Sequence, residues 1–264
     1  MYININFRRL GSVKLHSNRP YLKTMILTLV FLLSITGIAF AQSSEKLDYV
    51  ALGDSLAAGY TPNGTIDKSY TDFIAEKLDG EGVLGDYHNF GVPGYTTDNV
   101  FADIIDTTTP NYTNRISAIS NAEIITLDVG ANDLLNSIPA LMKDPNQAPA
   151  AIGNVARKIA QITFTLKSIN PKAKIYLMGY YNAFPYYTEE QQSQLVPLIK
   201  GFNLAVKQVA ATTGETYVDT YTSMDKHLVK YLPEDNIHPD LQGYRAIAKD
   251  FWNIIKVDFL RGIN

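Results

Sequence analysis

The hydrophobic residues of the chain fall into two kinds of segment that alternate along its length. The first kind is short, rich in Val, Ile, Leu and Tyr, and ends in Gly or in polar residues, which is typical of β-strands. These segments are residues 48–55, 86–92, 122–130, 174–180 and 216–221. The pattern therefore predicts five strands.

The second kind of segment carries apolar residues at every third or fourth position, which indicates helices with one buried face. Three such stripes stand out: Ile152, Val155, Ile159, Ile162, Leu166 and Ile169; Leu198, Phe202, Ala205 and Val209; and Leu241, Tyr244, Ala248, Phe251, Ile255 and Phe259. Asn170-Pro171 ends the first stripe, and Pro197 lies near the start of the second. We interpret all three stripes as core packing.

Strands that alternate with helices predict an α/β fold with a parallel sheet covered on both faces. Right-handed crossover connections make a three-layer αβα sandwich the expected arrangement. In such sheets functional groups gather beyond the carboxyl ends of the strands. The residues that follow each predicted strand are therefore the candidates for a functional site.

Composition excludes several classes of protein. The 264 residues are 46% hydrophobic and 19% charged with a net charge of −3, which is ordinary for a globular protein and gives no reason to expect a nucleic-acid partner. The chain has no cysteine, so disulfides, thiolate metal sites and cysteine nucleophiles are excluded. The His and carboxylate residues show no metal-ligand spacing, and no cofactor is expected.

The N-terminal region has the pattern of a secretory signal peptide. Basic residues precede an apolar segment at residues 25–38, and the small residues Ala39 and Ala41 follow it. We expect cleavage after Ala41, a secreted protein and one domain over residues 42–264. The alternative is an uncleaved membrane anchor, although the apolar segment is shorter than the ~20 residues of a spanning helix.

The end of the first strand places a serine at a strand-to-helix turn. Ser55 follows Gly53-Asp54 and precedes small, helix-compatible residues. Ser55 could be a nucleophile beside a helix N-terminus that favours negative charge. It could equally be the N-cap of that helix, a position that serine often takes.

The second and third strands end in residues that can offer uncharged hydrogen-bond donors. Gly91 and Gly94 flank a proline, so the backbone either exposes its N–H groups there or makes a simple tight turn. Asn132 follows Gly130 and carries an amide NH₂; it is a donor or a helix cap. Asp133 is a candidate cap for the following helix.

A histidine precedes the last helix in a distinctive setting. Asp235 and His238 are three residues apart, and Pro239 fits the first helical position while favouring an extended His238. The carboxylate could hold the Nδ1–H of the imidazole. His88 and His227 lack this setting. A hydroxyl, an imidazole, a carboxylate and neutral donors at successive strand ends are the components of acyl transfer.

An aromatic segment, residues 179–187, follows the fourth strand. We expect Tyr181, Phe184 and Tyr186 either to wall an apolar acyl site or to pack the loop onto the domain. Thr188 is expected to cap a short, mobile helix, with Gln191 at the reciprocal position. The G-x-G-x-x-G pattern at residues 80–85 follows a helix and precedes a strand, so we interpret it as a loop rather than a dinucleotide site.

Four ordered blocks resemble the GDSL, or SGNH, hydrolase family. They are Gly53-Asp54-Ser55-Leu56, Gly91 within its loop, Gly130-Ala131-Asn132-Asp133, and Asp235-Asn236-Ile237-His238. The resemblance implies a flavodoxin-like sheet of strand order 2-1-3-4-5, with no metal. It also implies a catalytic triad of Ser55, His238 and Asp235, and oxyanion donors from Ser55, Gly91 and Asn132. Secreted GDSL-type lipases and esterases of Gram-positive bacteria are the most similar members.

The expected function is that of a secreted serine esterase or lipase acting on small-molecule or lipid carboxylic esters. Two alternatives remain open: a deacetylase of polysaccharide or peptidoglycan, and a non-catalytic surface-binding module. The family hosts both the esterase or lipase activity and the deacetylase activity, and a fold does not choose between them. We expect a monomer that makes at most transient contact with membrane or cell wall.

Overall fold

The computed structural model describes residues 46–233 and 237–260 of the chain. Its centre is a parallel sheet of five strands in the order β2-β1-β3-β4-β5, as the resemblance implies. The strands are β1 (Leu47–Gly53), β2 (Leu84–Asn89), β3 (Ile124–Asp128), β4 (Lys174–Gly179) and β5 (Thr216–Asp219). All five predicted strands are present, and each is shorter than predicted because its last predicted residues belong to the loop or helix that follows.

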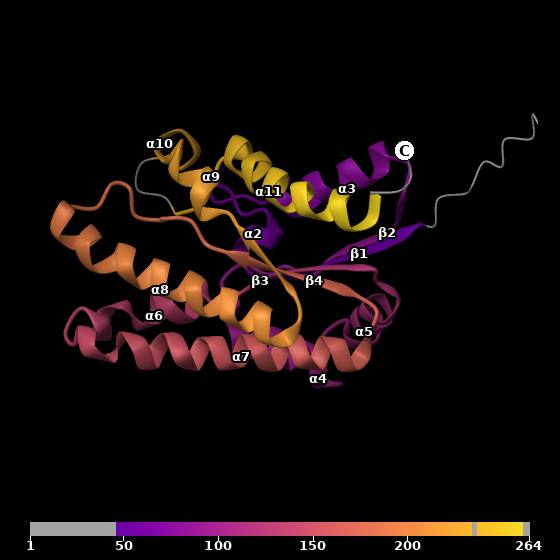
Figure 1. The fold of residues 1–264 in the computed structure, drawn as a ribbon, viewed down its shortest axis with the longest axis horizontal. Helices are drawn as coiled ribbons and strands as arrows, with labels where there is room; N and C mark the ends of the chain where they lie inside the picture. Colours follow the sequence, from indigo (N-terminus) through magenta and orange to yellow (C-terminus); the bar gives the residue numbers. More distant parts are fainter. Residues whose placement is uncertain (1–45, 234–236, 261–264) are drawn as a thin grey trace, which may run out of the picture. The chain divides into compact units, whose positions relative to one another are not determined.

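Helices cover both faces of the sheet (Figure 1), which confirms the predicted three-layer sandwich. Helices α3 (Tyr70–Gly80) and α11 (Leu241–Leu260) pack together on one face. Helices α4 (Thr97–Ile105), α5 (Tyr112–Asn121), α7 (Ala148–Ile169) and α8 (Glu189–Thr213) lie on the other. The shorter elements are α2 (Ser55–Ala58), α6 (Ala131–Leu141), the 3-10 turn η1 (Pro145–Gln147), α9 (Tyr221–Asp225) and α10 (Leu228–Tyr231).

The predicted stripes of α7 and α11 face the core. In α8, Phe202 and Val209 are buried, but Leu198 and Ala205 are half-buried and line a groove, so the core-packing interpretation is wrong for these two residues. Ile159, Ile162 and Leu166 of α7 are at most 2% exposed, and Asn170 ends this helix as expected. In α11, Tyr244, Ala248, Phe251 and Ile255 are fully buried, whereas Leu241 at its start is 37% exposed. Leu241 is exposed because it opens the first turn, before the helix runs over the sheet.

One expectation about a helix length and one about a helix start are wrong. Helix α8 begins after the predicted Thr188–Gln191 capping box, but it is 25 residues long and runs unbroken through Pro197. The reciprocal cap and the buried residues further along outweigh the one backbone hydrogen bond that an internal proline removes. Helix α11 begins at Leu241 rather than at Pro239, because the Asp240 carboxylate accepts the Gly243 N–H at 2.8 Å.

The glycine pattern of residues 80–85 follows a helix and precedes a strand, as predicted, but only residues 81–83 form the connection: Gly80 ends α3, and Gly85 lies in β2. Within the described ranges, none of the helices combines the length and apolar character needed to cross a bilayer.

Candidate active site

Ser55 and His238 meet at the carboxyl ends of the strands. The Ser55 Oγ lies 2.9 Å from the His238 Nε2, although 183 residues separate them in the chain. Ser55 is the first residue of α2, directly after β1, and His238 precedes α11. The topology therefore joins two blocks that the sequence places at opposite ends of the domain.

The cap of α2 is Asp54, not Ser55. The Asp54 Oδ1 accepts the Leu56 N–H at 3.0 Å, which satisfies the first turn and leaves the serine hydroxyl to contact the imidazole. Helix α2 has only four residues. It is too short to develop the macrodipole that a long helix would direct at the serine, so this expected contribution is small.

Two tyrosines position His238, one through its ring and the other through the backbone of the preceding residue. The Tyr60 ring lies edge-on to the imidazole, with centroids 4.8 Å apart. The Tyr181 hydroxyl donates to the backbone carbonyl of Ile237, the preceding residue, at 2.8 Å. Partial burial lowers the pKa of His238 below its ordinary value, which favours the neutral imidazole that a general base requires. Asp235, the predicted partner of this imidazole, lies outside the described residues.

A pair of buried carboxyl groups lies directly behind the nucleophile. Asp54 and Asp128 are 2% and 0% exposed, and β1 pairs with β3 so that Gly53 is opposite Asp128. The Asp128 Oδ2 accepts the Ala57 N–H at 3.2 Å and Oδ1 accepts the Tyr70 hydroxyl at 2.5 Å. Tyr180 donates to the Asp54 Oδ2 at 3.2 Å.

Burial raises the pKa values of both carboxyl groups in this pair. Burial raises the pKa of Asp54 to about 6, and burial together with the Asp54 charge raises the pKa of Asp128 well above its ordinary value. Two like charges in close contact disfavour each other's ionisation in a buried site, and this effect adds to burial at Asp128. At Gly53 a Cβ atom would lie 2.3 Å from the Asp128 Oδ1, so only glycine fits beside this pair.

The loop after β2 packs against α2. A Cβ at Gly91 would lie 2.5 Å from the Ala58 nitrogen, which explains a glycine there. The Gly91 N–H donates to the Asn89 Oδ1 at 2.9 Å. The Asn89 amide in turn donates to the Ala57 carbonyl at 2.7 Å. The backbone that was expected to expose its N–H groups is thus tied to the nucleophile turn through Asn89.

The start of α6 is also tied to that loop. Gly130 adopts a left-handed conformation (φ 111°) as the N-cap, so Asn132 is not the cap but lies in the first turn. The Asn132 amide donates to the Tyr95 carbonyl at 2.8 Å, which uses one of its two N–H groups. Asp133 does not cap its own helix; its carboxylate accepts the N–H and the hydroxyl of Thr97, the first residue of α4, whose N-cap is Thr96.

Ser55, Asn132 and His238 line one small cavity of about 70 Å³. Tyr181 and Phe184 of the aromatic segment also line it, whereas Gly91 and Tyr186 do not belong to its lining. The Tyr186 hydroxyl donates instead to the Leu232 carbonyl at 2.8 Å. The remaining walls are apolar and come mainly from α6 and α8: Leu134, Leu135, Ile138, Leu198, Ile199 and Phe202.

Sequence reasoning missed the carboxyl pair and these helix residues. The pair depends on strand register, and no local pattern marks it. Leu198 is a member of an ordinary apolar stripe, and Ile138 lies outside the predicted stripes. The spacing of a stripe signals a buried face but does not say which cavity the face lines.

The chain belongs to the GDSL-like Lipase/Acylhydrolase family, whose sequence profile matches residues 51–246. Membership places it among hydrolases that act on esters. It is 22% identical over 229 residues to the uncharacterized protein YpmR of Bacillus subtilis (strain 168), covering 83% of this chain and 85% of that protein.

Two solved structures share the fold. A lipase, Lip_vut3, from a goat rumen metagenome superimposes with a TM-score of 0.67 at 23% identity, over 79% of this chain and 97% of its own. The acetylxylan esterase Axe2 from Geobacillus stearothermophilus gives a TM-score of 0.59 at 17% identity, over 81% and 96%. At these identities the likeness concerns the fold.

Proposed function

We propose that the protein is a secreted serine esterase or lipase that hydrolyses carboxylic acyl esters. The observation that carries the proposal is the 2.9 Å contact between the Ser55 Oγ and the His238 Nε2. This distance permits proton transfer from the hydroxyl to a neutral imidazole. Secretion rests on the signal-peptide pattern of residues 1–41 alone.

The reaction proceeds in two halves. The Ser55 Oγ attacks the ester carbonyl carbon while its proton moves to the His238 Nε2. The C–O bond to the alcohol then breaks, and the imidazolium returns the proton to the leaving oxygen. Water, deprotonated by the same imidazole, hydrolyses the acyl-enzyme, releases the carboxylic acid and restores Ser55. We assign to Asp235 the role of accepting the Nδ1–H and stabilising the imidazolium.

We assign the oxyanion hole to the backbone N–H groups of Ser55 and Gly91 and to the Asn132 side chain. Asn132 lines the same cavity as Ser55, which supports its part. The Gly91 N–H now donates to Asn89, so a substrate oxyanion must replace the Asn89 oxygen as its acceptor. Donors of this kind count when they lie about 2.7–3.1 Å from the developing charge.

The walls of the cavity favour an acyl group over a sugar. Apart from the catalytic and oxyanion residues they consist mainly of Leu, Ile, Phe and Tyr side chains, which suit a hydrocarbon chain. Deacetylation of a polysaccharide is the second candidate. Its support is the fold shared with an acetylxylan esterase.

A panel of p-nitrophenyl esters of increasing acyl length tests the proposal. We expect turnover by the native protein and a loss of at least about 10³-fold in Ser55→Ala. Ser168→Ala, an exposed serine on α7, is the matched control and should leave turnover unchanged. Preference for longer chains supports the lipase, and preference for acetate supports the deacetylase. A Ser55→Ala protein that still hydrolyses esters well above buffer, or a native protein inactive on every ester and acetylated glycan, contradicts the proposal.

A further inference from the structure

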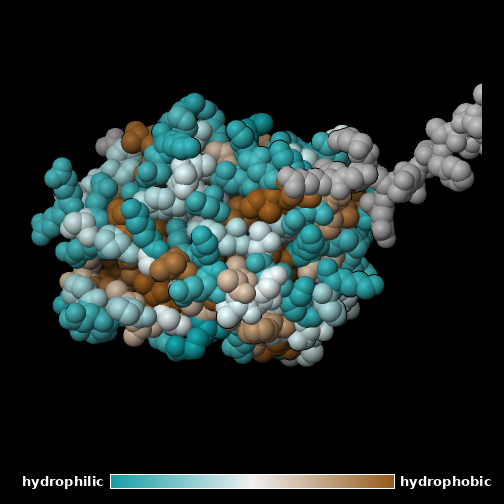
Figure 2. All heavy atoms as spheres, viewed as in Figure 1, coloured by the Kyte–Doolittle hydropathy of each residue, from teal (hydrophilic) through white to brown (hydrophobic). Residues whose placement is uncertain are grey.

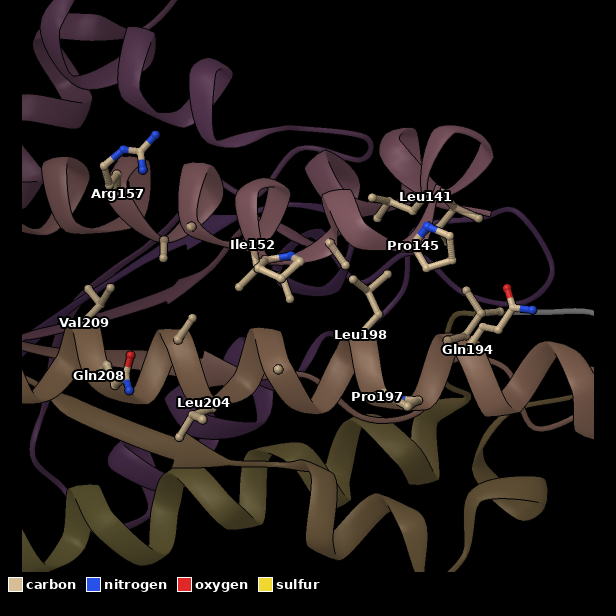
Figure 3. Close-up of a pocket in the computed structure, with 18 of the residues that line it drawn as sticks. Leu141, Pro145, Ile152, Arg157, Gln194, Pro197, Leu198, Leu204, Gln208 and Val209 are labelled. Carbon is tan, nitrogen blue, oxygen red and sulfur yellow. The ribbon is translucent and has the colours of Figure 1, made fainter. Parts of the chain in front are cut away.

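A groove between helices, much larger than the catalytic cavity, lies beside the active site. It has a volume of about 890 Å³ and lies between α6, η1, α7 and α8 (Figure 3). Brown, hydrophobic side chains gather in this region on the surface (Figure 2). We call it the α7–α8 groove.

The α7–α8 groove meets the catalytic cavity. Ile138 of α6 and Leu198 of α8 line both spaces. The side chain of Leu198 points from α8 into the space between the helices (Figure 3). Asn203 fixes α8 at this junction, because its amide oxygen accepts the Tyr180 N–H and its NH₂ donates to the Tyr180 carbonyl. The helix that forms the groove is thus anchored to the strand end that forms the site.

The chemistry of the groove suits hydrocarbon. Among the described residues that line it, Arg157 is the only charged one, and none is aromatic, so stacking surfaces for sugar rings are absent. Its floor includes Gly153 and Ala156 of α7 and Gly201 and Ala205 of α8. Leu204 and Met142 at its rim are 58% and 41% exposed, an arrangement that leaves apolar surface for a ligand to cover.

The dimensions also suit an acyl chain. From Leu198, where it meets the catalytic cavity, the groove follows α8 to Thr212, a rise of 14 residues or about 21 Å at 1.5 Å per residue. One acyl layer of a bilayer, half of a ~30 Å hydrocarbon core, is about 15 Å long, so a long acyl chain fits within this length. The catalytic cavity alone, at about 70 Å³, has room only for a short acyl group.

We propose that the α7–α8 groove is the distal binding site for the acyl chain of long-chain esters. The ester lies at Ser55, and the chain passes between Ile138 and Leu198 into the groove. This inference rests on the proposed ester hydrolysis, and it names the substrate class as long, unbranched acyl esters.

Gly153→Phe tests the groove without straining the fold. A Cβ at Gly153 would meet only the Arg157 Nη1, at 3.9 Å, and replacing a helical glycine favours the helix. The ring would occupy the groove. Gln161→Phe, on an exposed position of the same helix outside the groove, is the matched control.

The expected result is a change in chain-length preference. Each buried methylene favours binding by about fourfold, so excluding several of them lowers kcat/KM for dodecanoyl esters by at least tenfold. Acetyl and butyryl esters should change less than twofold, and Gln161→Phe should keep the native profile. Preference for acetyl esters, or a profile that Gly153→Phe leaves unchanged, would overturn the groove assignment while leaving ester hydrolysis intact.

A binding measurement separates the groove from the catalytic proposal. Ser55→Ala protein should bind dodecanoate in isothermal titration calorimetry, and adding Gly153→Phe should weaken binding at least tenfold. That result would support the groove even if no ester were hydrolysed. Absence of dodecanoate binding would overturn the groove assignment. A dimer in analytical ultracentrifugation that Gly153→Phe dissociates would also overturn it, because the groove would then be covered by a second copy of the chain.

Discussion

The hydroxyl of Tyr181 donates to the backbone carbonyl of Ile237 at 2.8 Å and thereby joins the end of β4 to the residue preceding His238. Tyr181 is 3% exposed and lines the catalytic cavity. Tyr181 was expected either to wall an acyl site or to pack its loop onto the domain; it is also a positioning residue for the imidazole. It acts through the backbone, since the contact is with Ile237 rather than with the ring of His238.

Replacing Tyr181 with Phe should lower kcat while the protein stays folded. The ring still packs, but the Ile237 carbonyl loses its donor and the imidazole its fixed position, so we expect a three- to tenfold loss, about 1 kcal/mol. Tyr186→Phe removes a hydroxyl with a similar carbonyl partner, Leu232, away from the cavity, and should leave kcat unchanged. Equal effects of the two substitutions on kcat would show that Tyr181 has no positioning role.

The pH dependence of kcat/KM should have an acid limb with a midpoint below about 6.5. Burial lowers the pKa of His238, so His238 stays neutral to a lower pH than an ordinary imidazole does. Activity therefore falls only when the pH drops below the ordinary imidazole pKa of about 6.5. Initial rates on p-nitrophenyl butyrate between pH 4 and 8 measure the limb. His227→Gln, on the remote helix cap, should leave it in place. A midpoint above 6.5, or a flat profile, would argue against His238 as the base.

Asn132→Ala should reduce kcat by about 10²–10³-fold, the usual effect of losing one oxyanion donor. The substitution also removes the bond to the Tyr95 carbonyl, so Tm is measured in parallel. Asn121→Ala is the control, because its amide donates to a backbone carbonyl on the surface of α5 at 3.0 Å. If Asn132→Ala loses stability but less than tenfold in kcat, Asn132 holds the loop and is not an oxyanion donor.

The Asp54–Asp128 pair should make the protein less stable as pH rises. Both pKa values are raised, so above about pH 4 the folded state retains protons that the unfolded chain releases. Stability then falls by up to about 1.4 kcal/mol per pH unit for each retained proton, through about pH 6 for Asp54 and beyond it for Asp128.

Asp128→Asn tests this by removing the proton-holding carboxyl. Urea unfolding between pH 5 and 8 should show a shallower loss of stability in the variant than in the native protein. Asp225→Asn, at an exposed carboxylate, should reproduce the native slope. Parallel slopes for native protein and Asp128→Asn would mean that Asp128 is ionised in the folded state.

The fold and the Ser55–His238 contact were predictable because they depend on local signals. Strand ends, helix stripes and the setting around His238 can each be identified within a few residues. Because functional groups gather at the carboxyl ends of parallel strands, these local signals also predict that Ser55 and His238 meet. The partner of His238 in that scheme, Asp235, lies outside the described residues and stays a prediction.

The carboxyl pair and the groove were not predictable, because they arise from how elements meet. Asp128 reaches Asp54 through the register that sets Gly53 opposite Asp128. The groove depends on α8 running unbroken through Pro197, a residue that the sequence suggested as a helix start. Spacing along one helix does not reveal the packing between two.

The central claim is that Ser55 is a nucleophile activated by His238, and covalent labelling tests it most directly. After reaction with an alkyl fluorophosphonate, peptide mass spectrometry of the native protein should locate the phosphonyl group on Ser55, and His238→Ala should be labelled at least 10²-fold more slowly. Labelling of another residue, or equal rates with and without the imidazole, would contradict the account.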